Sequence, residues 1–367
     1  MFDVTQPYII DNQHKKVIHH LMCAAPLVSI KDILALRAWL FQSSQGAALL
    51  MQAGDCAESI SAESLAAVQA KQRQFLLMTR IVSDLQPHPV VMIGRIAGQF
   101  AKPRSSSWDQ QYQQLAYHGD IVNDISLQAR QPESKRMLLA YTQAQSVLRR
   151  LKFVGRAIYT SHECLVLPYE RALTRQDQSY GDVNYAAHLL WLGARSLENK
   201  SLINYLSGII NPVAVKLPPT LSASALIDLL LRLNPTRASD RLILVPRLGC
   251  SNVLSILPDW LVAVKALPFR VSWMSDPMHA NTHYDVQGVK YRLLHEMIAE
   301  YQQVQRCCAA EGVFNLGLHL EVSPCQDIQE CVSHMPSGIR HYDSLMDPRL
   351  NAAQVVAFLQ ATIKSLA

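Results

Sequence analysis

Residues 211–247 read NPVAVKLPPTLSASALIDLLLRLNPTRASDRLILVPR, and this stretch decides the fold class. Two short apolar runs, PVAVKL (212–217) and RLILVPR (241–247), flank SASALIDLLLRL (222–233), in which leucines recur at helical spacing. Strands joined by a helix pair in parallel, because a parallel return needs a long crossover. The stretch therefore predicts a β–α–β unit.

The same alternation extends in both directions along the chain. The predicted strands are 47–54, 90–96, 157–163, 189–193, 212–217, 241–247, 271–277 and 315–321. The predicted helices are 31–43, 61–82, 137–153, 200–210, 222–233, 251–264, 288–310 and 351–367. Eight such units close into a (β/α)8 barrel. We therefore predict an α/β TIM barrel over residues 46–367, preceded by a short N-terminal extension, residues 1–45, that carries one helix.

Composition and charge exclude several classes of protein. Of the 367 residues, 49% are hydrophobic and 17% are charged, which is typical of a folded domain. No apolar run reaches the ~20 residues that a bilayer crossing needs, and the first residues do not resemble a secretory signal. The formal charge of +5 lacks the basic stripe of a nucleic-acid binder. The eight cysteines form no CxxC pair, so we expect reduced thiols in the cytoplasm, with no membrane or nucleic-acid partner.

Chemically capable side chains follow every predicted strand. In chain order they are Asp55 and Cys56, Arg95, His162 and Glu163, Arg195, Lys216, Arg247, Asp276 and His279, and His319 and Glu321. A barrel brings the C-terminal ends of all its strands to one rim, where the active site lies. We therefore expect these side chains to converge.

Cations form the first of two chemical sets in this group. They are Arg95, Arg195, Lys216 and Arg247, with Lys102 and Arg104 in the loop after the second strand. Cations that converge on one rim repel one another unless anions lie between them, and guanidinium groups suit phosphate and carboxylate. The plainer alternative is that they are solvated or salt-bridged rim charges.

The second set could hold a metal ion. It comprises Cys56, His279 and Glu321, with Asp347 after the last strand. A thiolate, an imidazole and two carboxylates suit Mn, Fe, Co or Zn better than Mg or Ca. The residues alone leave alternatives open, since Cys56 could be a buried core thiol and His279 and Glu321 hydrogen-bonded core or rim residues.

Other catalytic signatures are absent from the sequence. There is no GxSxG motif that would place a nucleophilic serine. Glycine-rich dinucleotide and P-loop patterns are also missing.

Nine motifs carry a resemblance to a known family. They are QAGDCAES (52–59), GRIAGQFAKPRS (94–105), HGDIVND (118–124), TSHECLVLPYERALTR (160–175), LLWLGARS (189–196), NPVAVK (211–216), SDPMHANT (275–282), GLHLE (317–321) and DPRLN (347–351). In this order the chain resembles the type II 3-deoxy-D-arabino-heptulosonate 7-phosphate (DAHP) synthases, from about residue 31 to residue 367. It is most similar to the short members of the phenazine pathway.

The resemblance implies a metal-dependent condensation of phosphoenolpyruvate with erythrose 4-phosphate that gives DAHP and phosphate. It implies that Cys56, His279, Glu321 and Asp347 hold the metal, with Mn²⁺ or Co²⁺ as the expected ion. The residues matched to phosphoenolpyruvate are Arg95, Ala194, Arg195, Lys216 and Arg247, and those matched to the aldose phosphate are Lys102, Arg104 and Ser105. Among these residues we expect Lys102, His279 and Cys56 to be catalytic. We also expect a homo-oligomer.

The chain departs from the family pattern at four positions. Ala194 replaces an acidic residue, although the group expected to meet the substrate there is a backbone N–H. Pro218 and Ala280 replace glycines beside substrate groups, and Met346 stands where cysteine is common. Two alternatives to DAHP synthase activity therefore remain: a synthase that takes a different aldose phosphate, such as an amino-substituted one, and a non-catalytic paralogue.

The helical insertion that long family members place before the third strand, and that is linked to regulation by aromatic amino acids, is missing from this sequence. We therefore expect tryptophan and phenylalanine to inhibit the enzyme weakly or not at all. Initial rates measured with each amino acid check this expectation, and strong inhibition by either one contradicts it.

Overall fold

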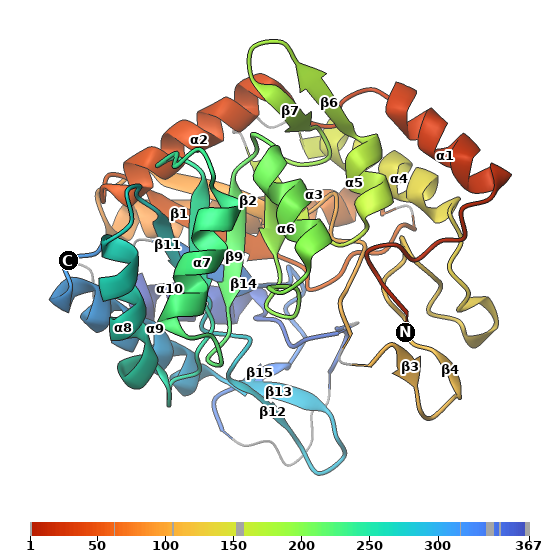
Figure 1. Ribbon diagram of the computed structural model, residues 1–367. Helices are drawn as coiled ribbons and strands as arrows, with labels where there is room; N and C mark the ends of the chain where they lie inside the picture. The colour runs from red at the N-terminus through yellow and green to blue at the C-terminus, as the bar shows by residue number, and fades with distance from the viewer. Residues whose placement is uncertain are drawn as a thin grey trace.

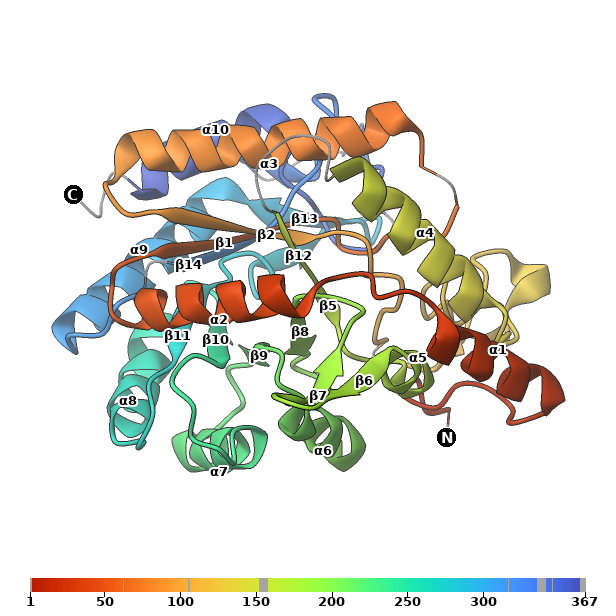
Figure 2. The same ribbon diagram turned by 90° about the horizontal axis from the view of Figure 1, so that it is seen from above.

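The computed structural model describes residues 2–61, 63–104, 106–151, 158–315, 317–334, 341–344 and 346–363. Eight parallel strands form a closed barrel in the order β1-β14-β11-β10-β9-β8-β5-β2 (Figures 1 and 2). Their bounds are β1 Leu49–Gly54, β2 Val90–Arg95, β5 Tyr159–Glu163, β8 Leu189–Leu192, β9 Val213–Leu217, β10 Leu242–Pro246, β11 Ser272–Ser275 and β14 Gly317–Glu321. The predicted (β/α)8 barrel is confirmed.

Helices follow the strands around the outside of the barrel. They are α3 Leu65–Leu85, α4 Arg136–Leu151, α5 Leu167–Ala172, α6 Lys200–Gly208, α7 Ala223–Leu233, α8 Val253–Lys265, α9 Leu294–Ala310 and α10 Ala352–Ile363. Helix α7 illustrates why they form. Ser222 caps its first turn by accepting the N–H of Ala225, and its leucines at positions 226, 229, 230 and 233 are buried along one face.

The N-terminal extension contains two helices, α1 Asn12–Cys23 and α2 Ile30–Ser44, where the sequence predicted only the second. Helix α2 lies across the N-terminal ends of the strands (Figure 2). Its Leu36 and Leu40 are fully buried in the interior of the barrel, and the carbonyl of Leu40 accepts the hydroxyl of Ser272, the first residue of β11. Burying each leucine contributes about 1.5–3 kcal/mol. Helix α2 therefore forms the floor of the barrel and leaves the opposite end open.

One predicted helix, over residues 288–310, is partly wrong. Its first turn is a strand, β13 Lys290–Leu293, which pairs with β12 Thr282–Tyr284 and β15 Cys331–Val332. The apolar and polar residues of Lys290–Leu293 also fit a strand pattern, and the short antiparallel pairing with β12 decides between the two. Helix α9 then starts at Leu294.

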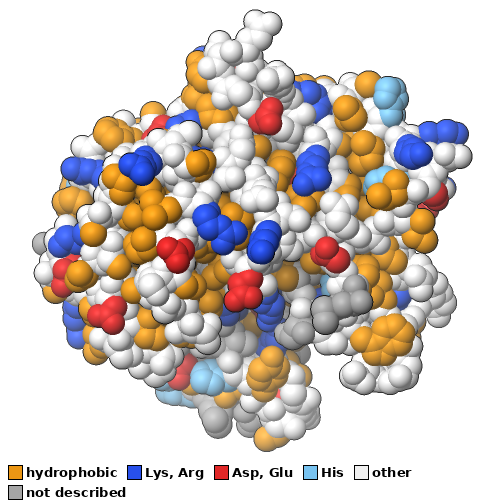
Figure 3. Space-filling view, viewed as in Figure 1, with side chains coloured by type: hydrophobic (Ala, Val, Ile, Leu, Met, Phe, Trp, Pro, Cys, Tyr) orange, Lys and Arg blue, Asp and Glu red, His pale blue; other side chains and the backbone are white. Residues whose placement is uncertain are grey.

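Two further hairpins interrupt the regular alternation. The long connection after β2 contains β3 Trp108–Asp109, β4 Gln114–Leu115 and the short 3-10 helix η1 Leu127–Ala129. The segment after α5 forms β6 Thr174–Asp177 and β7 Gly181–Asn184. In Figure 1 the β3–β4 and β12–β13 hairpins extend from the same end of the molecule, and Figure 3 shows a notch between the two lobes that carry them.

Among the described residues, none of the helices combines the length and the hydropathy that a membrane span requires.

Candidate active site

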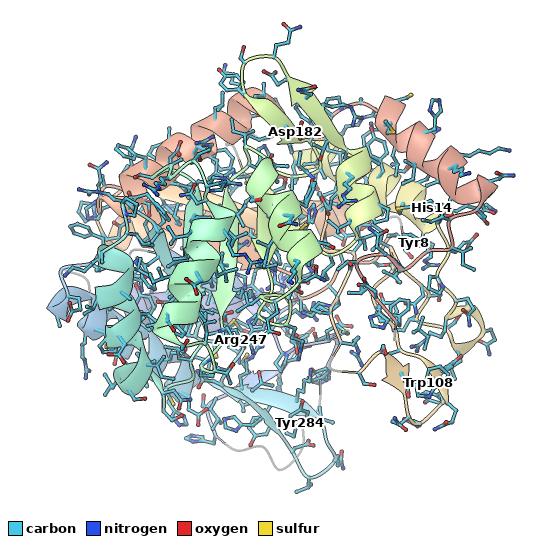
Figure 4. All side chains as sticks on the ribbon, viewed as in Figure 1. Tyr8, His14, Trp108, Asp182, Arg247 and Tyr284 are labelled. Atoms are coloured by element: carbon cyan, nitrogen blue, oxygen red, sulfur yellow. The ribbon has the colours of Figure 1, made fainter. Side chains whose placement is uncertain are left out.

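A cavity of about 570 Å³ opens at the C-terminal ends of the barrel strands. Its charged and imidazole lining groups are Lys102, Arg104, Arg195, Arg247, Lys290, His279, Asp109 and Asp347. Trp108 and Tyr284 line the same cavity, one from each of the two hairpins that flank the notch (Figure 4). The structure therefore brings together residues from the loops after β2, β8, β10, β11 and β14, as the sequence predicted for a barrel rim.

The close approach of β1 and β2 depends on Gly54. Its φ angle is +148°, and a Cβ atom there would lie 2.4 Å from the carbonyl oxygen of Arg95. Only glycine tolerates both conditions. The chain can then turn directly into Asp55 and Cys56, so that the Cys56 carbonyl oxygen accepts hydrogen bonds from Arg95 (3.4 Å) and Lys102 (3.0 Å).

Glu321 stands at the centre of the buried charges. Its Oε1 lies 3.0 Å from Arg95 Nη1 and 3.2 Å from His279 Nε2, and its Oε2 lies 3.0 Å from Arg292 Nη1. Burial alone would raise the pKa of Glu321, but His279 when protonated, and the permanent charges of Arg95 and Arg292, hold that pKa well below its ordinary value. Glu321 is therefore a carboxylate.

Asp347 is held between two lysines. Lys102 Nζ lies 3.0 Å from its Oδ2, and Lys290 Nζ lies 2.8 Å from its Oδ1. Burial would raise the pKa of Asp347, but the charge of Lys102 keeps it below its ordinary value. Both carboxylate oxygens thus face cations at the edge of the cavity.

Several buried guanidinium nitrogens of the described residues lack hydrogen-bond partners, and two of them belong to predicted substrate cations. Arg95 Nε and Arg247 Nε are buried and form no hydrogen bond with the described residues. A buried N–H without an acceptor costs about 1–3 kcal/mol. Burial also lowers the pKa of the nearby Lys216 to about 8. This part of the site is therefore short of negative charge.

His279 is oriented from behind by Asp276. Its Nδ1 lies 2.7 Å from Asp276 Oδ2, while its Nε2 points towards Glu321 Oε1. With the ring proton on Nδ1, the Nε2 lone pair faces a carboxylate oxygen, and a cation satisfies such a pair of acceptors. His279, Glu321 and Asp347 each offer a ligand atom within 4.8 Å of the others. These three residues therefore fit a divalent metal ion.

Cys56 lies beside this group, but its thiol is outside the set of three mutually close atoms. Its Sγ is 3.2 Å from Ser344 Oγ, and Ser344 in turn donates to the backbone carbonyl of Asp347. The thiol is thus connected to the Asp347 loop through one hydroxyl. A role for Cys56 as the fourth ligand remains a prediction.

The other predicted positions fall around the cavity or outside the described residues. Ala194 and Pro218 line a separate depression of about 500 Å³, and Arg195 lines both that depression and the main cavity. Ala280 packs against Gly249. Ser105 lies outside the described residues.

Three residues that support the site were not recognised in the sequence. Lys290 and Arg292 contact Asp347 and Glu321, but both belong to β13, which was read as the start of a helix. Glu300 faces inward from α9 and accepts hydrogen bonds from the backbone after β10. A helical periodicity predicts which face of α9 is buried, but it does not show which neighbouring loop a carboxylate meets.

The chain is similar to known proteins along most of its length. The model of a family described as the class-II DAHP synthetase family matches residues 3–157 and 151–361. A probable phospho-2-dehydro-3-deoxyheptonate aldolase from Pseudomonas fluorescens is 34% identical over 360 residues, which cover 93% of this chain and 90% of that protein.

More distant similarities agree with this match. Proteins named phospho-2-dehydro-3-deoxyheptonate aldolase from Streptomyces coelicolor and Neurospora crassa are 29% and 30% identical, and the alignments cover 95% of this chain and 92% and 89% of those proteins. The solved structure of the enzyme of that name from Francisella tularensis SCHU S4 has a TM-score of 0.62 at 14% identity, and 98% of each chain is covered. That last likeness concerns the fold alone.

Proposed function

Because this chain belongs to the class-II DAHP synthetase family, and is therefore an enzyme of the transferase class, a 3-deoxy-7-phosphoheptulonate synthase, we propose that it joins phosphoenolpyruvate to erythrose 4-phosphate with the help of a divalent metal ion. The observation that carries the proposal is the pair of buried, unpartnered nitrogens, Arg95 Nε and Arg247 Nε, beside a cavity lined with further cations. Two phosphorylated, anionic substrates supply the acceptors that these groups lack.

The cations divide naturally between the two substrates. Arg95 and Lys216 lie deep, with Arg95 Cζ and Lys216 Nζ 5.3 Å and 5.9 Å from the ring centre of Trp191. With Arg247 they suit the carboxylate and phosphate of phosphoenolpyruvate. Lys102 and Arg104, which belong to the loop between β2 and the β3–β4 hairpin, suit the phosphate of the aldose. Holding two anions in contact is mainly a task of orientation and electrostatics.

His279, Glu321 and Asp347 would hold the metal ion, with Cys56 proposed as a fourth ligand. A bound divalent ion supplies Lewis acidity, which polarises the aldehyde oxygen of erythrose 4-phosphate. Asp276 keeps His279 oriented, and Arg292 does the same for Glu321. Carbon 3 of phosphoenolpyruvate forms the new bond to the aldehyde carbon, water adds at carbon 2, and phosphate leaves with cleavage of its bond to carbon 2.

An assay of phosphate release from phosphoenolpyruvate tests the proposal. The purified protein should release phosphate only when erythrose 4-phosphate is present, should lose activity on chelation, and should regain it with Mn²⁺ or Co²⁺. Faster turnover of an amino-substituted aldose phosphate would instead favour the alternative substrate. The absence of turnover with every aldose and metal, in protein that binds metal, would favour a non-catalytic paralogue.

The Arg247→Ala variant should bind phosphoenolpyruvate less well. The change removes a charge-assisted hydrogen bond, so kcat/KM for phosphoenolpyruvate should fall by the equivalent of about 1.5–3 kcal/mol, or roughly 10- to 150-fold. Steady-state kinetics measure this, with Arg80→Ala as the control because Arg80 lies on the surface of α3 and is 81% exposed. Unchanged kinetics in Arg247→Ala would remove Arg247 from the site.

The Cys56→Ser variant should bind the metal more weakly and turn over more slowly, because a hydroxyl is a poorer ligand than a thiolate. Isothermal titration with Mn²⁺ or Co²⁺ measures the affinity directly. Cys325→Ser, at an exposed cysteine, is the matched control. If Cys56→Ser keeps both its metal content and its activity, Cys56 is not a ligand.

A further inference from the structure

The guanidinium group of Arg95 sets the direction of a chain of hydrogen bonds in the interior of the barrel. A guanidinium group can only donate hydrogen bonds, and it stays protonated in proteins. Arg95 Nη1 lies 3.2 Å from His319 Nε2 and 3.0 Å from Glu321 Oε1, so that its two hydrogens have two acceptors. His319 Nε2 must therefore carry a lone pair rather than a proton.

The remaining partners of His319 continue the chain without conflict. His319 Nδ1 lies 2.6 Å from Gln52 Oε1, which accepts its proton, and Gln52 Nε2 donates to Ser161 Oγ at 2.8 Å. Ser161 then donates to the carbonyl oxygen of Gly94 at 3.0 Å. Gly94 directly precedes Arg95, so the chain of hydrogen bonds begins and ends on β2 after crossing β5, β1 and β14.

Every member of this chain is shielded from water. Gln52, Ser161, His319 and Arg95 are each no more than 2% exposed. Asp276 Oδ2 lies 3.9 Å from His319 Nε2, beyond hydrogen-bonding distance. Lys216 and His279 also act on His319 electrostatically, and the His279 ring centre is 5.7 Å from that of His319. Reversing one hydrogen bond would leave a buried donor facing a donor, so the direction of the whole chain is fixed.

We propose that the hydrogen-bonded chain from Ser161 through Gln52 to His319 is a positioning device for Arg95, in which His319 accepts from Arg95 through Nε2 and donates to Gln52 through Nδ1. The device fixes the plane of the Arg95 guanidinium by occupying one Nη1 hydrogen, while Glu321 occupies the other. The Nε–H is then left for an anion. This role rests on the proposed function only in naming phosphoenolpyruvate as the anion that Arg95 meets.

The tautomer can be measured independently of activity. In protein labelled with ¹⁵N-histidine, the His319 signals, identified by their loss in His319→Gln, should show a protonated Nδ1 and an unprotonated Nε2. Neutron diffraction from crystals of the unmodified protein would give the same answer without a variant. A proton on Nε2, alone or together with one on Nδ1, would overturn the assignment whatever the substrate is.

The positioning role is tested at the remote end of the chain. Ser161→Ala removes the acceptor of Gln52 without touching the cavity, and it should raise the KM for phosphoenolpyruvate about two- to tenfold, the usual size of one lost hydrogen bond. The kcat and the KM for erythrose 4-phosphate should change less than the KM for phosphoenolpyruvate.

Ser272→Ala is the matched control, because Ser272 is also a buried serine of the barrel but donates to Leu40 at the closed end. It should lose similar stability and keep the wild-type KM for phosphoenolpyruvate. Equal kinetic effects in the two variants, or no effect in Ser161→Ala, would refute the positioning role. If the enzyme used no phosphoenolpyruvate at all, the proposed function would fail while the tautomer measurement would still stand.

Discussion

The Glu321→Gln variant is expected to lose synthase activity and to lose about 3–5 kcal/mol of unfolding free energy, the usual effect of removing one partner from a buried ion pair. Glu321 is fully buried between Arg95 and Arg292, and its Oε1 also faces His279. An amide at this position leaves two guanidinium groups buried without a counter-charge. It also removes a proposed ligand of the metal.

Urea denaturation and the phosphate-release assay measure the two effects separately. Glu311→Gln is the matched control, because Glu311 pairs with Lys265 in a partly exposed ion pair away from the cavity, and such pairs contribute about 0–1 kcal/mol. A Glu321→Gln protein as stable as the wild type would show that the two arginines do not depend on this carboxylate.

The second large effect is expected at Glu300, which joins two loops of the site. Its Oε1 accepts the backbone N–H groups of Leu248 and Gly249, at 2.9 Å and 3.0 Å, directly after Arg247. Its Oε2 accepts Asn281 Nδ2 at 2.6 Å, two residues after His279. The carboxyl group of Glu300 thus fixes the loop of a proposed substrate cation against the loop of a proposed metal ligand.

At pH 9, above the pKa of about 8 of Glu300, the folded protein holds a carboxylate there. Glu300→Gln should then cost about 1–3 kcal/mol of stability, because the new amide N–H₂ faces the N–H₂ of Asn281. It should also lower kcat/KM for phosphoenolpyruvate, since the Arg247 loop is released. The double variant Glu300→Gln with Asn281→Asp restores an acceptor opposite the new donor and should recover part of both losses. Failure of the second change to recover either would argue against this contact.

The pH dependence of the unfolding free energy tests the raised pKa of Glu300 independently of activity. Burial raises its pKa from 4.5 to about 8. Between these values the unfolded chain has released the proton and the folded protein retains it, so that stability falls as pH rises, by up to about 1.4 kcal/mol per pH unit. Denaturation of wild type and Glu300→Gln from pH 4.5 to 8 should show this slope in the wild type only. Parallel curves would contradict it.

Much of the fold follows from local patterns. The eight barrel strands were predicted within one or two residues, because short β-rich runs bounded by helical segments have few other ways to bury both faces. The prediction was wrong for the first turn of the helix at 288–310, because Lys290–Leu293 pairs with Thr282–Tyr284 as a strand. A pairing between two segments cannot be predicted from either segment alone. Helices α1 and α5 were also missed.

By itself the sequence determined the barrel and, through the rule that strand ends share one rim, the gathering of Arg247, His279 and Asp347 around one cavity. Only the tertiary structure decided which buried group each charge meets: that Arg292 and Arg95 share Glu321, and that Glu300 reaches the backbone after Arg247. The reason is physical. Periodicity reports which face of an element is buried, whereas an ion pair or a hydrogen bond depends on distances of about 3 Å between side chains from elements far apart in the chain.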